Sequence, residues 1–236
     1  LAEQETRFAS KDKIRSKYLY KTTFDGAGEY QEKRKVLGIA HYPQCTLTFL
    51  NRGLSKPDSE EPFSDSGQEF QIGYQLQREA LILRYDRKIC FQQSHIVSLA
   101  AALNRAMIDG YGLDEAEIRL LTEISPAKAD STETDLGYVV FYDASGNGSI
   151  PLKRIFNEFD HLVELAYQKL LECPGSHGEP CKKGCYACLR SYYTQYVASS
   201  VDKPTALMFL GYLLGKNAFA PSIEPFEKTP DQFDLT

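Results

Sequence analysis

Segments rich in β-branched and aromatic residues come first along the chain, and apolar residues take helical spacing from about Ser94 and again toward the C-terminal end. From Val36 to Asn51 the β-branched and aromatic content rises, which predicts two strands, LGIAHYP and CTLTFLN. Residues 52–68 contain proline, glycine and several acids and predict a loop. FQIGYQLQ and ALILRY then predict two further strands, and EIRLLTEI and GYVVFYD predict two more.

Helical spacing of apolar residues, at i, i+3, i+4 and i+7, predicts the helices. One helix begins near Ser94 and ends at the glycines 110–112. A second spans 151–172, with Pro151 at its start. A short helix is expected over 189–197, and Asp202 is a typical N-cap for a last one. Since strands come first and helices dominate the end, the predicted fold class is α+β, a mixed sheet with packed helices.

The bulk composition is that of an ordinary globular protein, with 42% hydrophobic residues and a net charge of −5. No run approaches the roughly 18 apolar residues that a membrane helix needs. The first residues are charged where a signal peptide would be apolar. We therefore expect a cytoplasmic protein that does not enter a membrane. Because the chain begins with leucine, we also expect it to be a fragment of a longer one.

Charge is distributed unevenly between the two ends. Residues 7–35 carry nine Lys and Arg against four Asp and Glu, whereas 218–236 carry four acids and one lysine. We interpret 1–35 as a basic N-terminal arm or the end of a preceding domain, 36–217 as one domain, and 218–236 as an acidic tail. Both ends are either solvated or leave room for a local nucleic-acid surface.

Four of the six cysteines lie within sixteen residues, in CPGSHGEPCKKGCYAC. Without a secretory signal, such clustered cysteines indicate metal ligands rather than disulfides. Zinc takes four soft ligands at tetrahedral corners about 2.3 Å from the metal, and a C-x2-C pair supplies two of them from one turn. We predict one structural zinc ion in a C-terminal zinc lobe over 173–203, bound by Cys173, Cys181, Cys185 and Cys188. His177 lies inside the loop and is an alternative ligand to Cys173.

Several segments together resemble the MrfA-type zinc-binding domain, also called MZB or the DUF1998 family. The resemblance covers roughly 36–217. It rests on GYVVFYDASGNGS, the long helix after it, GCYACLRSYYTQY, VDKPTALMFL, FLNRG and GYQLQREALIL. In this family a Tyr-Asp pair precedes a glycine-rich turn, and a Cys-x2-Cys precedes an aromatic-bearing helix. The seven-residue gap after Cys173 departs from the family pattern.

The resemblance implies a domain that accompanies a superfamily 2 DEAD/DEAH-box helicase motor, in the same chain or as a separate subunit. Members of this family act in DNA repair and in defence against phage. We therefore expect a zinc-binding accessory domain that contributes to DNA binding or strand separation. The alternative is a non-catalytic scaffold subunit that docks a separate helicase through protein–protein contacts.

The segment KKGCYACLRSYYTQY interleaves basic and aromatic residues, which suits contact with a single strand of DNA. The candidates are Lys182, Lys183, Arg190, Tyr192 and Tyr193. Some of the tyrosines, Tyr186 and Tyr196 included, are alternatively expected to pack over the zinc lobe.

No catalytic motif is apparent. DEAE (114–117) follows a turn instead of a buried strand, and GYLLGK (211–216) is one residue short of a phosphate loop. DASGNG (143–148) begins like a calcium-binding EF-hand loop, but its twelfth position is Arg154 and a strand precedes it. We interpret it as a tight turn between a strand and a helix. Whether the chain takes part in catalysis therefore depends on a helicase partner.

Overall fold

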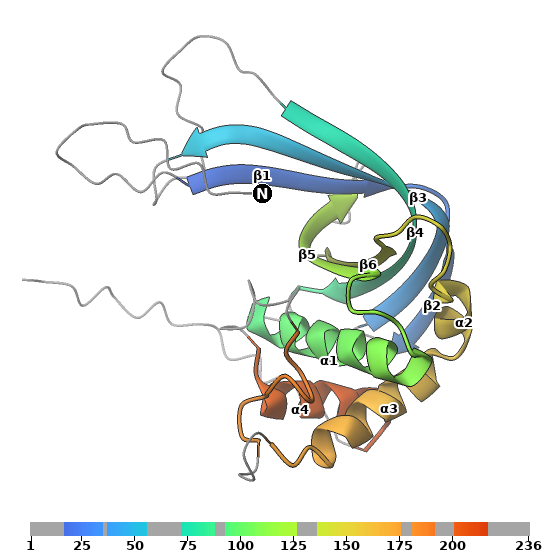
Figure 1. The fold of residues 1–236 in the computed structure, drawn as a ribbon, viewed down its shortest axis with the longest axis vertical. Coiled ribbons are helices and arrows are strands. Elements are labelled where there is room, and N and C mark those ends of the chain that lie inside the picture. The colour runs from blue at the N-terminus through green and yellow to red at the C-terminus, as the bar shows by residue number, and fades with distance from the viewer. Residues whose placement is uncertain are drawn as a thin grey trace, which may run out of the picture.

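The computed structural model describes residues 17–34, 37–55, 72–87, 93–126, 136–175, 181–191 and 201–216. The strands are β1 (Lys17–Asp25), β2 (Glu29–Arg34), β3 (Leu37–Ser55), β4 (Ile72–Asp86), β5 (Ile118–Pro126) and β6 (Leu136–Asp143). The helices are α1 (Gln93–Tyr111), α2 (Leu152–Asn157), α3 (Phe159–Leu171) and α4 (Lys203–Leu213). Four strands come first, α1 lies between β4 and β5, and α2, α3 and α4 follow β6 (Figure 1).

All six strands belong to one mixed sheet in the order β1-β5-β6-β4-β3-β2. β1 also pairs with β3 in antiparallel register, and it pairs with β5 in parallel through Thr23 and Phe24. Strands β1, β3, β4, β6 and β5 therefore form a closed ring, and β2 adds to the outside of β3. The predicted mixed sheet with packed helices is confirmed, but its closure was not predicted.

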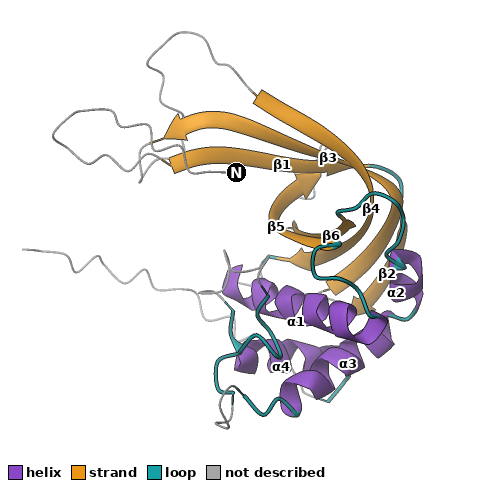
Figure 2. Cartoon of the chain, in the orientation of Figure 1, coloured by secondary structure: helices purple, strands orange, loops and turns teal. Residues whose placement is uncertain are grey.

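The two faces of the sheet bury separate apolar cores. Inside the ring, a small core contains Phe24, Leu47, Ile82 and Val140. The opposite face carries Ile39, Leu81, Leu83, Val139 and Phe141. α1 and α2 contact the sheet, and α3 and α4 pack against α1 to complete the same core (Figure 2). The alternation of side chains along each strand explains this division, since successive residues point to opposite faces.

Residues 17–34 correct the predicted N-terminal arm, because they form β1 and β2 of the same sheet. Thr22, Thr23 and Phe24 favour an extended backbone, and the last two are buried. Lysines such as the exposed Lys21 hid this pattern within a charged segment. The boundary placed at residue 36 is therefore wrong. Residues 1–16 and the predicted acidic tail, 218–236, lie outside the described residues.

Two expected interruptions are absent from the strands. LGIAHYP and CTLTFLN form the single strand β3, with a register shift between Tyr42 and Cys45. FQIGYQLQ and ALILRY likewise contribute to one strand, β4. Arg78 and Glu79, the polar residues between them, are part of the same strand. The polar residues in the middle of these two strands therefore do not mark the end of a strand.

The expected helix over 151–172 is divided at Glu158 into α2 and α3. Glu158 has φ −99° and ψ 22°, outside helical values, and its backbone N–H still donates to the carbonyl of Arg154. Apolar positions on both sides of the break are buried, so the periodicity continues through it and does not reveal it. α1 and the strands β5 and β6 lie where they were predicted. None of the described helices is long and apolar enough to cross a membrane.

Candidate metal centre

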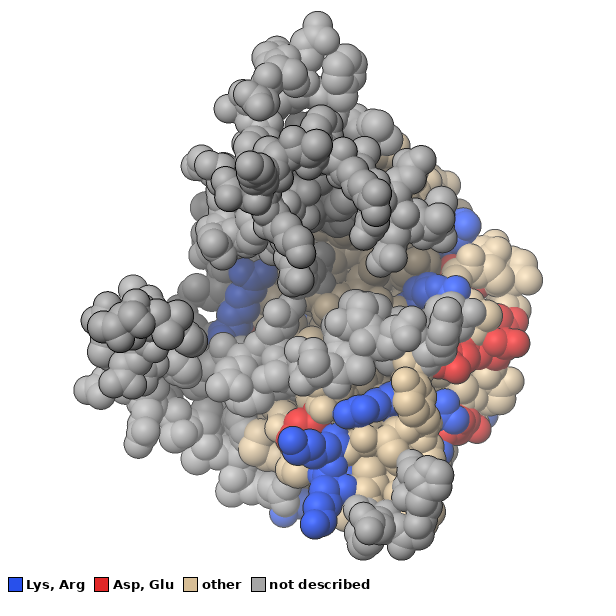
Figure 3. All heavy atoms as spheres, turned by 60° about the vertical axis from the view of Figure 1, so that its left-hand side comes forward, with Lys and Arg blue, Asp and Glu red and all other residues tan. Residues whose placement is uncertain are grey.

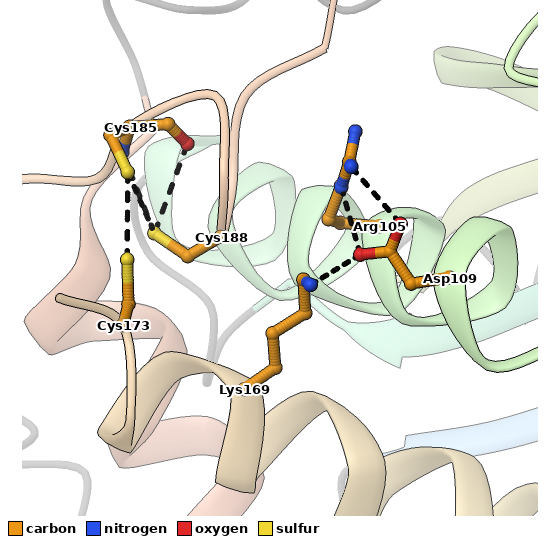
Figure 4. Close-up of polar contacts among 6 residues, drawn as sticks. All are labelled: Arg105, Asp109, Lys169, Cys173, Cys185 and Cys188. Atoms are coloured by element: carbon orange, nitrogen blue, oxygen red, sulfur yellow. Dashed lines mark hydrogen bonds and ion pairs between the residues drawn. The ribbon is translucent and has the colours of Figure 1, made fainter. Parts of the chain in front are cut away.

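α3 brings the chain to the cysteines, and an ionic contact ties this helix to α1 (Figure 4). Asp109 on α1 accepts from Arg105, one turn earlier, with 3.0 Å between Nη2 and Oδ1, and also contacts Lys169 on α3. Cys173 follows two residues after the last residue of α3. The position of this cysteine is therefore fixed by the packing of two helices.

The four predicted cysteines come together, with all four Sγ atoms within 4.8 Å of one another. Three Sγ–Sγ distances are 3.5 Å for Cys173 to Cys185, 3.7 Å for Cys181 to Cys188, and 3.8 Å for Cys185 to Cys188. A zinc ion at tetrahedral Zn–S distances requires sulfur separations of about 3.8 Å. The group therefore fits zinc, and the chemistry of four thiolates favours the same metal.

A tight turn shapes the C-x2-C pair. The carbonyl oxygen of Cys185 accepts from the backbone N–H groups of Cys188, Leu189 and Arg190, at 3.0–3.2 Å. Gly184, with φ +112°, precedes the turn, and a Cβ atom there would lie 2.8 Å from the Leu189 side chain. Only glycine meets both conditions without strain.

The turn is anchored in the helical core. Cys188 and Leu189 are each 1% exposed and belong to the core that the helices share. The carbonyl of Lys183 accepts from the backbone N–H of Lys203, at the start of α4. The turn is therefore held by the helical core and by the start of α4.

The environment distinguishes the four thiols electrostatically. Burial disfavours the Cys185 thiolate, but hydrogen bonds from the Ala187 backbone and the other three cysteines outweigh it and lower the pKa of Cys185 to about 7. Burial raises the pKa of Cys188, which lies deepest. Since thiolates are the form that binds metal, Cys185 is the ligand most readily available near neutral pH.

The predicted nucleic-acid candidates divide into exposed and partly buried side chains. Lys182 and Lys183 are exposed, and neither forms an ion pair with a described residue. Arg190 is half-buried, and its Nε atom is buried without a hydrogen-bond partner in the described part of the chain. Tyr186 is 61% exposed. Tyr192, Tyr193, Tyr196 and the alternative ligand His177 lie outside the described residues, as does most of the predicted helix 189–197.

One positioning residue was missed from the sequence. The hydroxyl of Ser98, on α1, accepts from the backbone N–H of Asp202 at 2.9 Å. Asp202 in turn caps α4, as predicted, by accepting from the backbone N–H of Thr205. Ser98 lies 104 residues away in the sequence, so no local signal indicated this contact.

DASGNG forms the expected turn. The Asp143 carboxylate accepts from the backbone N–H groups of Ser145, Gly146 and Gly148 at 2.8–3.1 Å. Both carboxylate oxygens of Asp143 are thus hydrogen-bonded within the turn 143–148. Gly146 and Gly148 have φ of +69° and +72°, values that glycine adopts without strain.

A four-cysteine group on a sheet-and-helix core is the ligand set of a zinc-binding domain. Residues 99–189 match the family model described as the MrfA Zn-binding domain, and all four cysteines lie within the match. The resemblance stated from the sequence is confirmed for this part of the chain. No curated protein sequence matches the chain.

The fold is similar to a crystal structure of the DUF1998 helicase MrfA bound to DNA. The two share 17% sequence identity with a TM-score of 0.53, over 83% of this chain and 25% of that chain. A structure of the same helicase bound to DNA and AMPPNP aligns at 18% identity over 81% of this chain and 22% of that chain, with a TM-score of 0.39. The chain thus spans about a quarter of the length of the helicase chain it resembles.

Proposed function

We propose that this chain is a zinc-containing accessory domain of a DNA helicase, which binds DNA or helps to separate its strands beside the motor. The observation that carries the proposal is the cluster of four cysteines at zinc-compatible distances, within a segment that matches the MrfA Zn-binding domain. The related helicase structure contains DNA, which supports DNA as the ligand. DNA repair or phage defence is the proposed setting, and the reducing cytoplasm, which keeps thiols free for metal, is the proposed compartment.

The first test concerns the metal. The protein prepared without chelators is expected to contain one zinc ion per chain by elemental analysis. Cys188→Ser should lower this content and loosen the lobe, because Cys188 is both a proposed ligand and part of the helical core. Cys45→Ala is the matched control, since Cys45 is fully buried in the other core and lies outside the cluster. Absence of zinc from the wild-type protein would overturn the proposed metal site.

The second test concerns DNA. Figure 3 shows several Lys and Arg side chains in the lower part of its view and others at mid-height, with Asp and Glu mainly on the right-hand side. Lys182 and Lys183, next to the cysteine cluster, are exposed, which supports a contact with phosphates. The double variant Lys182→Glu/Lys183→Glu should weaken the binding of labelled single-stranded DNA. The slope of log K against log salt should flatten by about 1.4 if both lysines contact phosphates.

Lys182→Arg/Lys183→Arg is the control, since it keeps both charges. Equal affinity of the charge-reversed and wild-type proteins would contradict a phosphate contact at the lobe. A wild-type chain that shows no DNA affinity but co-purifies with a helicase would favour the scaffold alternative.

A further inference from the structure

The strands β1, β3 and β4 extend beyond the closed part of the sheet (Figure 1). In the described residues, β6 pairs with β4 only from Ala80 onward, and β5 pairs with β1 only at Thr23 and Phe24. Among the described residues, the first half of β4 therefore pairs with β3 on one edge and with no strand on the other edge. The inner face of this extension continues the inner face of the ring.

Five side chains gather where the extension meets the ring, and we refer to them as the aromatic–arginine cluster. They are Phe49, Tyr74, Arg78, Arg119 and Tyr142. Side chains alternate along a strand, so Tyr74 and Arg78 of β4 point to the same face as Ala80 and Ile82 of the inner core. Tyr142 pairs with Ala80 on one side and with Arg119 on the other, which places all three strands' residues on this face.

The cluster has the properties of a stacking platform. The rings of Phe49 and Tyr74 are stacked, with centroids 4.6 Å apart and an interplanar angle of 12°. Tyr74 is nevertheless 59% exposed. Because its partner ring fixes its plane, an incoming planar group would meet a preorganised surface.

Positive charge lies beside this platform. The pKa of Tyr142 is raised, first by burial and then by the nearby Tyr74, while Arg119 and Arg78 act in the opposite direction. The four groups are therefore within electrostatic range of one another. Arg78 forms no ion pair with any described carboxylate, and its Nε atom is buried without a hydrogen-bond partner there.

Backbone contacts hold both guanidinium groups. Arg78 Nη1 donates to the carbonyl of Gln77 at 2.8 Å, and its Cζ lies so close to Gly146 that a Cβ atom there would be 2.7 Å away. Arg119 Nη1 donates to the carbonyl of Ala116 at 2.8 Å. A backbone carbonyl carries no net charge, so the contact of Arg78 with Gln77 does not neutralise its guanidinium group.

We propose that the aromatic–arginine cluster binds single-stranded nucleic acid, with one base stacked on Tyr74 and the adjoining phosphates near Arg78 and Arg119. An unpaired strand fits because its bases expose the flat faces that a duplex hides, and stacking with aromatic residues accepts any base. The inference rests on the proposed function in taking DNA as the ligand. It places the contact on the sheet face opposite the helices, on elements that do not include the zinc lobe.

The test uses the full, zinc-loaded chain and a labelled oligothymidine of about 16 nucleotides. Tyr74→Ala should weaken binding about 5- to 150-fold, the effect of losing one stacked base. Tyr74→Phe should bind within about 2-fold of wild type, because the ring is kept. Tyr30→Ala is the matched control, since Tyr30 is 45% exposed on β2 and lies outside the cluster. Thermal melting verifies that each variant is folded.

A second measurement locates the contact directly. An oligonucleotide carrying 5-iodouracil should photo-cross-link to Tyr74 or to its neighbours on β4. Weaker binding by Tyr74→Ala together with this cross-link would support the inference. Normal binding by Tyr74→Ala, with the lysine double variant defective and cross-links confined to the zinc lobe, would overturn it and leave the proposed function standing. A wild-type chain without affinity for single strands would overturn both.

Discussion

Replacing Asp143 with alanine tests how the turn between β6 and α2 is held. Asp143 is 1% exposed, and its carboxylate accepts three backbone hydrogen bonds from the turn. A hydrogen bond to a charged group contributes about 1.5–3 kcal/mol. The donors Ser145, Gly146 and Gly148 are exposed and regain water in the variant, so about 1 kcal/mol each is the appropriate value. We expect Asp143→Ala to lower the free energy of unfolding by about 3 kcal/mol.

Asp143→Asn divides this effect into its parts. An amide keeps the oxygen that accepts from Ser145 and Gly146 but presents an NH2 group to the Gly148 N–H. The expected loss is therefore about 1 kcal/mol. Asp114→Ala is the control, because Asp114 makes a similar contact to Ala116 on an exposed turn and should cost about 0.5 kcal/mol or less.

Urea denaturation followed by circular dichroism measures these differences, with zinc present throughout. A loss of 3 kcal/mol would lower the urea midpoint by about 1.5 M if the m-value is near 2 kcal/mol/M. The explanation would be refuted if Asp143→Ala cost no more than Asp114→Ala. An Asp143→Asn variant as unstable as Asp143→Ala would show that the charge, and not the pattern of acceptors, is what matters.

The stability difference between the wild-type protein and Asp143→Asn should depend on pH. Burial raises the pKa of Asp143, but hydrogen bonds from the Ser145 hydroxyl and from the backbone of Gly148, Gly146 and Ser145 outweigh it, so the folded pKa is below 3.8. The stability it contributes is complete above the unfolded pKa and is lost as the pH falls through the lower, folded pKa. The midpoint difference between wild type and Asp143→Asn should therefore be constant at neutral pH and narrow below pH 3.8.

Two further substitutions test the zinc lobe and its anchor. Gly184→Ala should lower the free energy of unfolding by about 2–3 kcal/mol and weaken zinc retention against a competing chelator, because the φ of Gly184 is positive and the new Cβ meets Leu189. Gly112→Ala is the control, since Gly112 has φ +64° with open space around it. This variant should lose about 1 kcal/mol and retain zinc like the wild type. Asp202→Ala should lower stability by about 1 kcal/mol in thermal unfolding, since Thr205 loses its cap, whereas Asp202→Asn should retain most of it.

Local chemistry made some parts of the molecule predictable. The cysteine spacing indicated a metal group before any geometry was known, because a C-x2-C turn presents two thiolates on one side. Likewise, α1 followed from its apolar periodicity, and the cap at Asp202 followed from residue type. Each of these features depends on residues within about one turn or one loop of one another.

Features that depend on distant pairing could not be predicted. The ring closes because Thr23 lies beside Ser125, about a hundred residues apart, and neither residue signals the pairing locally. Phe49 and Tyr74 stack because the antiparallel register of β3 and β4 places them opposite each other. The group of four cysteines could thus be predicted from the sequence, whereas the aromatic–arginine cluster depends on the pairing of strands far apart in the sequence.

The division into two cores suggests that the two proposed contacts respond differently to the metal. Cys188 and Leu189 belong to the core shared by the helices, so loss of zinc would act first on α3, α4 and their packing. Tyr74 and Arg78 lie on β4, whose inner face contributes Ile82 to the other core beside Leu47 of β3. Because β4 contributes alternate side chains to both cores, it couples them only through its backbone. Under the proposed function, we therefore expect zinc to order the lysine-bearing lobe, and we expect the proposed stacking contact on the sheet to be independent of the metal.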